Sequence, residues 1–208
     1  MMRLDNSVLF DDQTEPVRFD LPGADVTLFP SFFDARESDV LFRELLDNTR
    51  WQQDFITIYG RQVRLPRLTA WYGDAERHYT YSAITMRPEQ WTPALLAIKE
   101  RIEPVSGVTF TSVLLNLYRD GSDSVSWHQD DEPELGEEPV IGSVSFGQTR
   151  LFQLRHKKRK DIETVSIGLA HGSFLLMKGE TQRFWKHQLP KSSAPMGPRV
   201  NLTFRVIA

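Results

Sequence analysis

Two residues that commonly bind metal ions lie two positions apart in the middle of this chain. On a strand or an extended loop, His128 and Asp130 would project from the same face. A second histidine far along the chain, His187, could complete a set of two imidazoles and one carboxylate. This ligand set suits Fe(II) and leaves three adjacent positions for substrates. The His-x-Asp spacing alone is a weak signal, because it arises easily by chance in 208 residues.

The segment just before the C-terminus strengthens the metal hypothesis. From residue 199 to residue 206, polar and apolar residues alternate, as on a strand with one polar and one apolar face. The polar members are Arg199, Asn201, Thr203 and Arg205, and the apolar members are Val200, Leu202, Phe204 and Val206. A guanidinium group binds a carboxylate through paired hydrogen bonds. The two arginines therefore favour a cavity that binds a dicarboxylate able to chelate the metal.

Several segments of the chain resemble the AlkB family of Fe(II)- and 2-oxoglutarate-dependent dealkylating dioxygenases, in particular the branch that includes human AlkB homologue 2. The resemblance spans about residues 50–208 and so covers the whole expected catalytic domain. It is carried by Tyr72-Gly-Asp74, Tyr79-Thr-Tyr81, Asn116-Leu-Tyr118-Arg-Asp-Gly121, His128-Gln-Asp130-Asp-Glu132, Gly142-Ser-Val-Ser-Phe-Gly147, Ala170-His-Gly-Ser173, His187-Gln-Leu-Pro190 and Pro198-Arg-Val-Asn-Leu-Thr-Phe-Arg205.

The resemblance implies a role for each residue of the site. Iron would be bound by His128, Asp130 and His187, and 2-oxoglutarate by Asn116, Tyr118, Arg199, Asn201, Thr203 and Arg205. Within that set, Arg199 would pair with the distal carboxylate and Arg205 with the carboxylate next to the keto group. The base pocket would contain Tyr79, Tyr81, Asp131 and Glu132 beside His128.

The resemblance also implies a reaction. With Fe(II), 2-oxoglutarate and O2, the enzyme would hydroxylate N-alkyl groups of DNA bases such as 1-methyladenine and 3-methylcytosine, releasing formaldehyde, succinate and CO2. These cationic lesions pair poorly, which lowers the cost of flipping the base out of the helix. Two alternatives remain open: the same iron chemistry on RNA, a protein or a small molecule, or a jelly-roll binding module without catalysis.

Some residues of the base pocket have a second interpretation. Tyr79 and Tyr81 share a face if the segment is extended; such alternation is typical of a half-buried strand, although flat aromatic rings also hold unstacked bases. Asp131 and Glu132 follow the metal carboxylate and either face water or lie near a cation, such as the iron or a positively charged alkylated base.

Two further segments are candidates for contact with DNA. Residues 55–59 and 62–65 predict a β-hairpin with Gly60-Arg61 between the strands. Tyr59 at its tip is either a surface residue or a wedge that enters the base stack. The basic run 155–160 is either a solvated loop or a phosphate-binding one. The expected DNA contacts are Tyr59, Gly60, Arg61, Arg67, Arg155, Lys157, Lys158, Arg159 and Lys160.

The remaining sequence indicates the elements that must position these residues. Asp34 begins a predicted helix that reaches Asn48, and Thr92-Pro93 begins a second helix that ends at Gly107. Predicted strands follow at 110–118, 140–146, 150–155, 164–169, 173–177 and 199–207, after an earlier one at 24–30. This order favours an α+β fold that is mainly β: a double-stranded β-helix (jelly roll) with N-terminal supporting helices and a nucleotide-recognition hairpin.

Length and composition set the broad class. A chain of 208 residues with 40% hydrophobic residues fits an N-terminal arm (1–22) and a single dioxygenase domain (23–208). Within that domain, we expect a nucleotide-recognition region at 50–90 and the catalytic core at 110–208. The absence of cysteine excludes disulfides and thiolate metal sites.

Charge and targeting signals limit the kinds of partner that we expect. Residues 1–47 carry four Lys or Arg and eleven Asp or Glu, a net charge of −7 that leaves +4 on the rest of the chain. This asymmetry fits either ordinary surface variation or a mild basic bias around a binding face. The sequence shows no signal peptide and no segment of membrane-spanning length. We expect a cytoplasmic monomer with alkylated DNA, or alternatively RNA, as its partner and no membrane contact.

Overall fold

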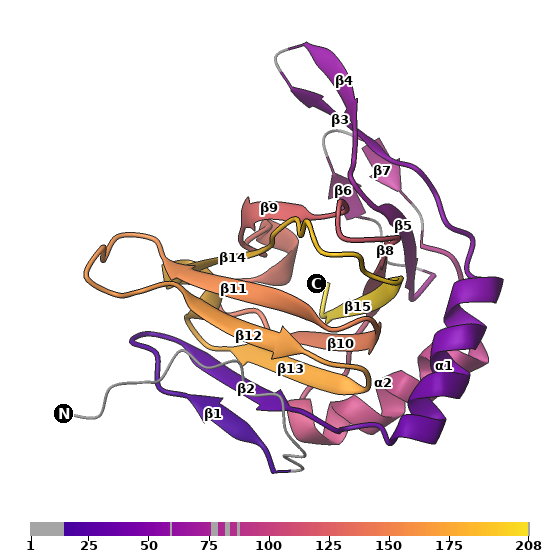
Figure 1. The fold of residues 1–208 in the computed structure, drawn as a ribbon, viewed down its shortest axis with the longest axis horizontal. Helices are drawn as coiled ribbons and strands as arrows, with labels where there is room; N and C mark the ends of the chain where they lie inside the picture. The colour runs from indigo at the N-terminus through magenta and orange to yellow at the C-terminus, as the bar shows by residue number, and fades with distance from the viewer. Residues whose placement is uncertain (1–14, 59, 76–78, 82–83, 87, 208) are drawn as a thin grey trace.

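The core of the protein is a sandwich of two antiparallel sheets (Figure 1). The computed structural model describes residues 15–58, 60–75, 79–81, 84–86 and 88–207. One sheet has seven strands in the order β1 (Val17–Phe19), β2 (Asp25–Phe29), β13 (Ser173–Lys178), β10 (Ile141–Gly147), β15 (Arg199–Arg205), β8 (Ser112–Tyr118) and β5 (Leu68–Gly73). The other has four, in the order β12 (Val165–Leu169), β11 (Arg150–His156), β14 (Trp185–Leu189) and β9 (Val125–His128).

Two small hairpins lie outside the sandwich. The first, β3 (Phe55–Ile58) with β4 (Arg61–Arg64), projects from the body, and the second, β6 (Tyr79–Tyr81) with β7 (Ile84–Met86), lies at its base (Figure 1). Ile58 pairs with Arg61, so the second strand begins one residue earlier than expected. The predicted hairpin is confirmed.

Alternation along the strands separates two cores. Side chains on one face of the seven-stranded sheet pack against the helices, and those on the other face point between the sheets. On β10, for example, Val144 and Phe146 belong to the helix-side core, whereas Ile141 belongs to the core between the sheets. The polar face of β15 points between the sheets as well, so it must be satisfied by a polar cavity there.

Helix α1 (Ala35–Asn48) begins where the sequence predicts it. The side chain of Asp34 accepts a hydrogen bond from the Glu37 backbone N–H at 2.8 Å, which satisfies an amide at the helix N-terminus. Leu45 is buried in the helix-side core. The helix supports the sheet rather than taking part in the site.

Both predicted ends of the second helix, α2 (Pro93–Ser106), are confirmed. Thr92 caps it through the Leu95 N–H at 3.3 Å, and Gly107 ends it in the left-handed region at φ 75°. Figure 1 shows α1 and α2 together covering the outer side of the large sheet. Neither is long and apolar enough to cross a membrane, nor is any other helix in the described part of the chain.

The sequence missed several short elements. These are β1, β5, β7, β9, β14, the four-residue helix α3 (Thr181–Phe184) and the 3-10 turn η1 (Pro133–Leu135). β1 lies within the expected N-terminal arm and pairs with β2. The mainly-β, double-sheet architecture with supporting helices is otherwise the one the sequence predicts.

Candidate active site

The predicted metal ligands converge between the sheets. β9 and β14 are neighbours, and His128 and His187 are directly opposite each other across the pair. Their ring centroids are 4.2 Å apart. Asp130 follows β9, and one ligand atom from each of the three residues lies within 4.8 Å of the others. Two imidazoles and one carboxylate can therefore bind one ion.

Neighbouring groups orient these ligands. The carbonyl oxygen of Ser126 is 2.8 Å from Nδ1 of His128, which directs the Nε2 atom of that ring to the metal position. The backbone N–H of Asp130 donates to Oε1 of Gln182 at 3.1 Å. Gln182 is buried and belongs to α3, so a short helix outside the sandwich holds the backbone of Asp130, just after β9, in place.

Charge at the site keeps the ligands in the form that binds metal. Burial alone would raise the pKa of Asp130, but Arg205 and the two imidazoles outweigh it and lower this pKa to about 2. Arg205 donates to Oδ1 of Asp130 at 2.9 Å. Burial lowers the pKa of His187 to about 3, with His128 adding to the effect. At neutral pH, therefore, Asp130 is ionised and His187 is neutral.

A cavity of about 60 Å³ lies against these ligands. Its walls combine the metal ligands, the polar residues of β15 and side chains from both sheets. The lining residues are Arg67, Leu114, Asn116, Tyr118, Val125, His128, Asp130, Ser143, Phe152, Met177, His187, Leu189, Arg199, Asn201, Thr203 and Arg205. All nine residues assigned to iron and 2-oxoglutarate thus face one space, which only the tertiary fold could establish.

Arg199 is the most deeply buried cation of the cavity, with 2% of its surface exposed. One terminal nitrogen donates to Oγ of Ser145 at 2.9 Å, and the guanidinium carbon lies 5.2 Å from the centre of the Tyr118 ring. Its Nε is buried and has no hydrogen-bond partner among the described residues. Burial lowers the pKa of Arg199 to about 10, with the neighbouring Arg150 cation adding to the effect.

Other polar residues of β15 and β8 are hydrogen-bonded in two groups. The Asn201 side chain donates to Oγ of Ser143 at 2.8 Å, and the Thr203 hydroxyl donates to Oδ1 of Asn201 at 3.2 Å. The Asn116 side chain accepts from Nε of Arg67 at 2.7 Å. Such bonds fix the rotamers of the cavity wall, so that the cavity is shaped before a ligand enters.

The donor set fits the predicted ligands. A set of two imidazole nitrogens and one carboxylate is the facial arrangement of Fe(II) oxygenases, with room for further ligands on the cavity side. A buried arginine with an unsatisfied N–H calls for an anion, and a carboxylate supplies matching acceptors. The cavity therefore combines a metal-binding set with a buried cation that suits a carboxylate.

The residues expected around the substrate base are only partly described. Tyr79 and Tyr81 lie on β6, but their side chains are outside the described part of the structure. Asp131 is exposed and accepts from the Gln129 side-chain amide. Glu132 is half-buried, and its Oε2 has no hydrogen-bond partner among the described residues. Both acidic residues follow Asp130 directly in the chain, and neither lines the metal cavity.

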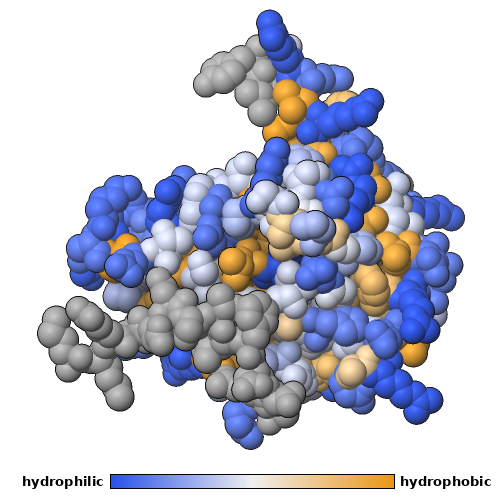
Figure 2. All heavy atoms as spheres, in the orientation of Figure 1, coloured by the Kyte–Doolittle hydropathy of each residue, from blue (hydrophilic) through white to orange (hydrophobic). Residues whose placement is uncertain are grey.

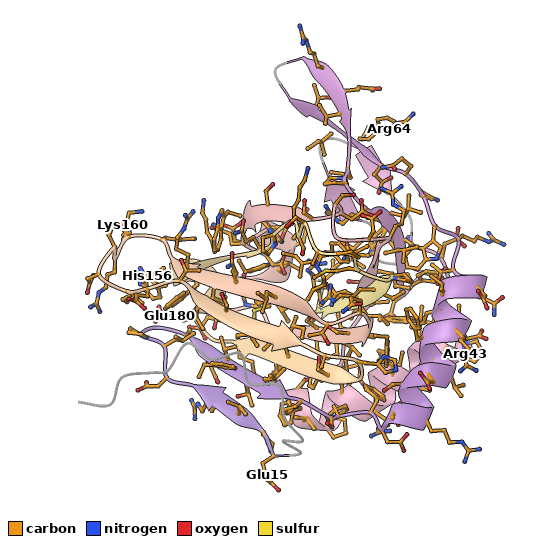
Figure 3. All side chains as sticks on the ribbon, viewed as in Figure 1. Glu15, Arg43, Arg64, His156, Lys160 and Glu180 are labelled. Carbon is orange, nitrogen blue, oxygen red and sulfur yellow. The ribbon has the colours of Figure 1, made fainter. Side chains whose placement is uncertain are left out.

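The expected DNA contacts fall into two exposed groups and one exception. Tyr59 lies outside the described residues, whereas Gly60 and Arg61 are exposed on the projecting hairpin. The basic run begins at the end of β11 and continues into the β11–β12 connection, where Figure 3 shows Lys160 at the periphery. Arg155, Lys158, Arg159 and Lys160 are exposed and Lys157 is half-buried. The exception is Arg67, which lines the metal cavity.

Comparison with known proteins gives consistent results. The family model described as "2OG-Fe(II) oxygenase superfamily" matches residues 25–205. Human "Alpha-ketoglutarate-dependent dioxygenase alkB homolog 3" is 46% identical over 190 residues, which cover 88% of this chain and 66% of that protein. "DNA oxidative demethylase ALKBH2" is 41% identical in mouse, covering 84% of this chain and 77% of the relative, and 40% identical in human, covering 84% and 70%.

The comparisons refine the expected relationship. The chain spans slightly less than two thirds of the human alkB homolog 3 protein. Identity to alkB homolog 3 exceeds identity to ALKBH2, so the expected closeness to the homologue 2 branch holds only in part. A solved structure described as "The structure of OsALKBH1" superimposes with a TM-score of 0.64 at 20% identity, covering 91% of this chain and 99% of that one, and supports the fold. With its family model, its relatives and its His-Asp-His centre in agreement, this chain belongs to the AlkB family of the 2OG-Fe(II) oxygenase superfamily.

Proposed function

We propose that this protein removes alkyl groups oxidatively from nucleic-acid bases, with DNA carrying 1-methyladenine or 3-methylcytosine lesions as its substrate. The observation that carries the proposal is the single cavity in which the metal triad and both arginines of β15 meet. The name of one relative, DNA oxidative demethylase, supports the substrate class.

The chemistry divides between the bound groups and the protein. When bound, Fe(II) and 2-oxoglutarate use O2 to hydroxylate the N-alkyl carbon, with succinate and CO2 as co-products, and the hydroxylated group leaves as formaldehyde. His128, Asp130 and His187 would bind the metal, and Arg205 holds the Asp130 carboxylate through a hydrogen bond of 2.9 Å. Arg199 would bind the far carboxylate of the co-substrate.

Charge near the metal favours a cationic base. Asp131 and Glu132 follow the metal ligand Asp130 directly in the chain, and the buried Oε2 of Glu132 has no hydrogen-bond partner among the described residues. A base alkylated on a ring nitrogen carries positive charge, so these carboxylates would attract it more strongly than an unmodified base. Weak pairing of such a base also lowers the cost of extracting it.

The exposed surface supports a nucleic-acid partner. Figure 2 shows hydrophobic atoms among hydrophilic ones on the projecting hairpin, where Phe55 and Val63 are 51% and 42% exposed. Apolar side chains on a projecting element can enter a base stack, and the cations of the β11–β12 connection can bind phosphates. An RNA substrate would use the same features, so it is the second candidate; a protein or small-molecule substrate would need neither.

The test is a demethylation assay on matched oligonucleotides. Methylated single-stranded DNA, duplex DNA and single-stranded RNA are incubated with protein, Fe(II), 2-oxoglutarate and ascorbate, and demethylated base, formaldehyde and succinate are quantified. We expect equal amounts of repaired base and formaldehyde, and no turnover by a His187→Gln variant. Succinate without base repair, from intact iron-loaded protein, would contradict nucleic-acid dealkylation; failure to bind 2-oxoglutarate would support a non-catalytic module.

A further inference from the structure

Arg150, at the start of β11, is buried to 3% exposure without being a ligand of the proposed centre. It donates three hydrogen bonds, all to backbone carbonyl oxygens: Asp120 at 3.0 Å, Asp123 at 2.9 Å and Pro190 at 2.8 Å. A planar guanidinium can serve three acceptors in fixed directions at once, which a lysine ammonium does less well. Arg150 therefore joins two segments that are 70 positions apart in the chain.

These segments are the two connections next to the cavity. Residues 119–124 lead from β8 to the metal strand β9, and residues 190–198 lead from β14 to the arginine strand β15 (Figure 1). We call them together the loop cap. The Ser192 N–H donates to the Gly121 carbonyl at 2.8 Å, and a Cβ on Gly121 would lie 2.7 Å from the Ser192 carbonyl oxygen. The two connections are thus in direct contact, with no space for a side chain between them.

The loop cap adjoins the Arg199 end of the cavity. Tyr118 ends β8, is the direct cross-strand partner of Arg199, and immediately precedes the cap. Its ring lies 5.2 Å from the Arg199 guanidinium carbon and 5.8 Å from that of Arg150. Arg150 thus lies near the same aromatic ring as the proposed carboxylate ligand, and it holds the segment that precedes Arg199 and the segment that follows Tyr118.

We infer that Arg150 is a positioning residue for the co-substrate: by holding the loop cap closed, it fixes the far wall of the cavity at Arg199 and so sets both the affinity and the length selectivity for a 2-oxo dicarboxylate. The inference rests on the proposed function, because it assumes that 2-oxoglutarate is the ligand of Arg199. It goes beyond it, because Arg150 touches neither the metal ligands nor the expected position of the co-substrate.

The rival explanation is that Arg150 only stabilises the fold. A global effect would weaken every activity of the protein together. A positioning effect would instead be specific: weaker binding of 2-oxoglutarate, less discrimination against 2-oxoadipate, which is one methylene longer, and unchanged metal binding. Arg150 hydrogen-bonds none of the three metal ligands, and the ladder between β9 and β14 and the Gln182 hydrogen bond to Asp130 hold them independently, so the affinity for the ion should be spared.

Arg150→Lys is the informative variant, because it keeps the positive charge and removes the planar fork. The matched control is Arg101→Lys on α2, where the arginine donates to the Phe32 carbonyl at 2.8 Å and to Glu37 on the opposite side of the large sheet from the cavity. Both substitutions remove hydrogen bonds from a structural arginine. Only the first should affect the cavity.

Two measurements test the inference. Hydrogen exchange on the metal-free proteins should show faster exchange in both 119–124 and 190–198 for Arg150→Lys, with α1 and α2 unchanged. Calorimetry on anaerobic Fe(II)-loaded proteins should show 2-oxoglutarate binding weakened by about tenfold or more. This is the effect typical of residues that orient the direct ligands without touching the bound group. The ratio of 2-oxoglutarate to 2-oxoadipate affinity should fall, while Fe(II) affinity stays within about twofold of the wild type.

Each outcome decides the matter. Unchanged 2-oxoglutarate affinity and selectivity in folded Arg150→Lys would overturn the inference while leaving the proposed function intact. Equal loss of 2-oxoglutarate binding in Arg101→Lys would assign the effect to global stability and overturn it as well. Failure of the wild-type protein to bind 2-oxoglutarate would overturn the proposed function together with the inference.

Discussion

Replacing Arg199 by methionine should have opposite effects on binding and on stability. In the metal-free protein this guanidinium is buried, hydrogen-bonded to Ser145 at 2.9 Å, and left with an Nε that has no partner among the described residues. A residue placed for the fold would have its hydrogen bonds satisfied within the protein. A residue placed for a ligand is stabilised only when the ligand arrives.

The size of both effects follows from the structure. Burial lowers the pKa of Arg199 from 12.5 to about 10, which corresponds to an unfavourable free energy on the order of 3 kcal/mol for the charged side chain. Loss of the hydrogen bond to Ser145 offsets about 1 kcal/mol of this unfavourable free energy. Metal-free Arg199→Met should therefore be more stable by about 1–2 kcal/mol, which raises the Tm by a few degrees. Loss of a buried carboxylate pair costs about 3–5 kcal/mol, or roughly 150- to 4,000-fold in 2-oxoglutarate affinity.

Urea unfolding of the metal-free proteins and calorimetric titration of anaerobic Fe(II)-loaded proteins measure the two effects. Arg101→Met is the control, because it loses bonds to Glu37 and to the Phe32 carbonyl and should lower stability without changing 2-oxoglutarate affinity. An Arg199→Met variant that is less stable than the wild type and still binds 2-oxoglutarate would refute the assignment of Arg199 as an anion ligand.

Three further predictions concern the metal ligands and the basic connection. Gln182→Leu removes the acceptor for the Asp130 N–H and should weaken Fe(II) binding by about tenfold in competition with a chelator; unchanged affinity would make the amide dispensable. His187 is neutral in the folded metal-free protein, whereas in the unfolded chain it becomes protonated below pH 6.5. Its contribution to the free energy of unfolding should therefore be fully present above pH 6.5 and should be lost as the pH falls toward about 3. A His187→Gln variant should lose this part of the slope, and an unchanged slope would contradict the shifted pKa. Joint replacement of Lys157 and Lys158 by glutamine should reduce the salt slope of DNA binding by about two if both contact phosphates, and an identical slope would remove them from the interface.

Local signals predicted the helices. The Asp34 cap, the Thr92-Pro93 start and the Gly107 end each depend on residues within one turn of the helix, and all three are present. Strands in which polar and apolar residues alternate strictly, such as residues 199–205, could also be predicted. Their polar and apolar faces lie where the alternation predicts, toward the cavity and the helix-side core.

Elements whose pattern depends on tertiary surroundings were missed. β5 has buried residues on both faces, so its sequence shows no alternation. β9 is four residues long and carries Ser126 and Trp127 between the cavity residues Val125 and His128. Short strands of this kind form because their neighbours supply the hydrogen bonds, and no local propensity marks them.

The same limit applies to the site. His128, Asp130 and His187 could be predicted because the chemistry restricts the residue types, and the resemblance supplied their partners. Gln182 and Arg150 could not, since single polar residues act there through contacts with segments distant in sequence. Arg67 shows the reverse case: its place near the hairpin suggested the surface, whereas its hydrogen bond to Asn116 directs it into the cavity.

The most direct test of the metal centre is a crystal structure of the protein grown anaerobically with Fe(II) and 2-oxoglutarate, with the iron located by anomalous scattering. We predict one ion bound by His128, Asp130 and His187, with the co-substrate chelating it and its far carboxylate paired with Arg199. Iron bound elsewhere, or a co-substrate that leaves Arg199 without a carboxylate, would contradict the account.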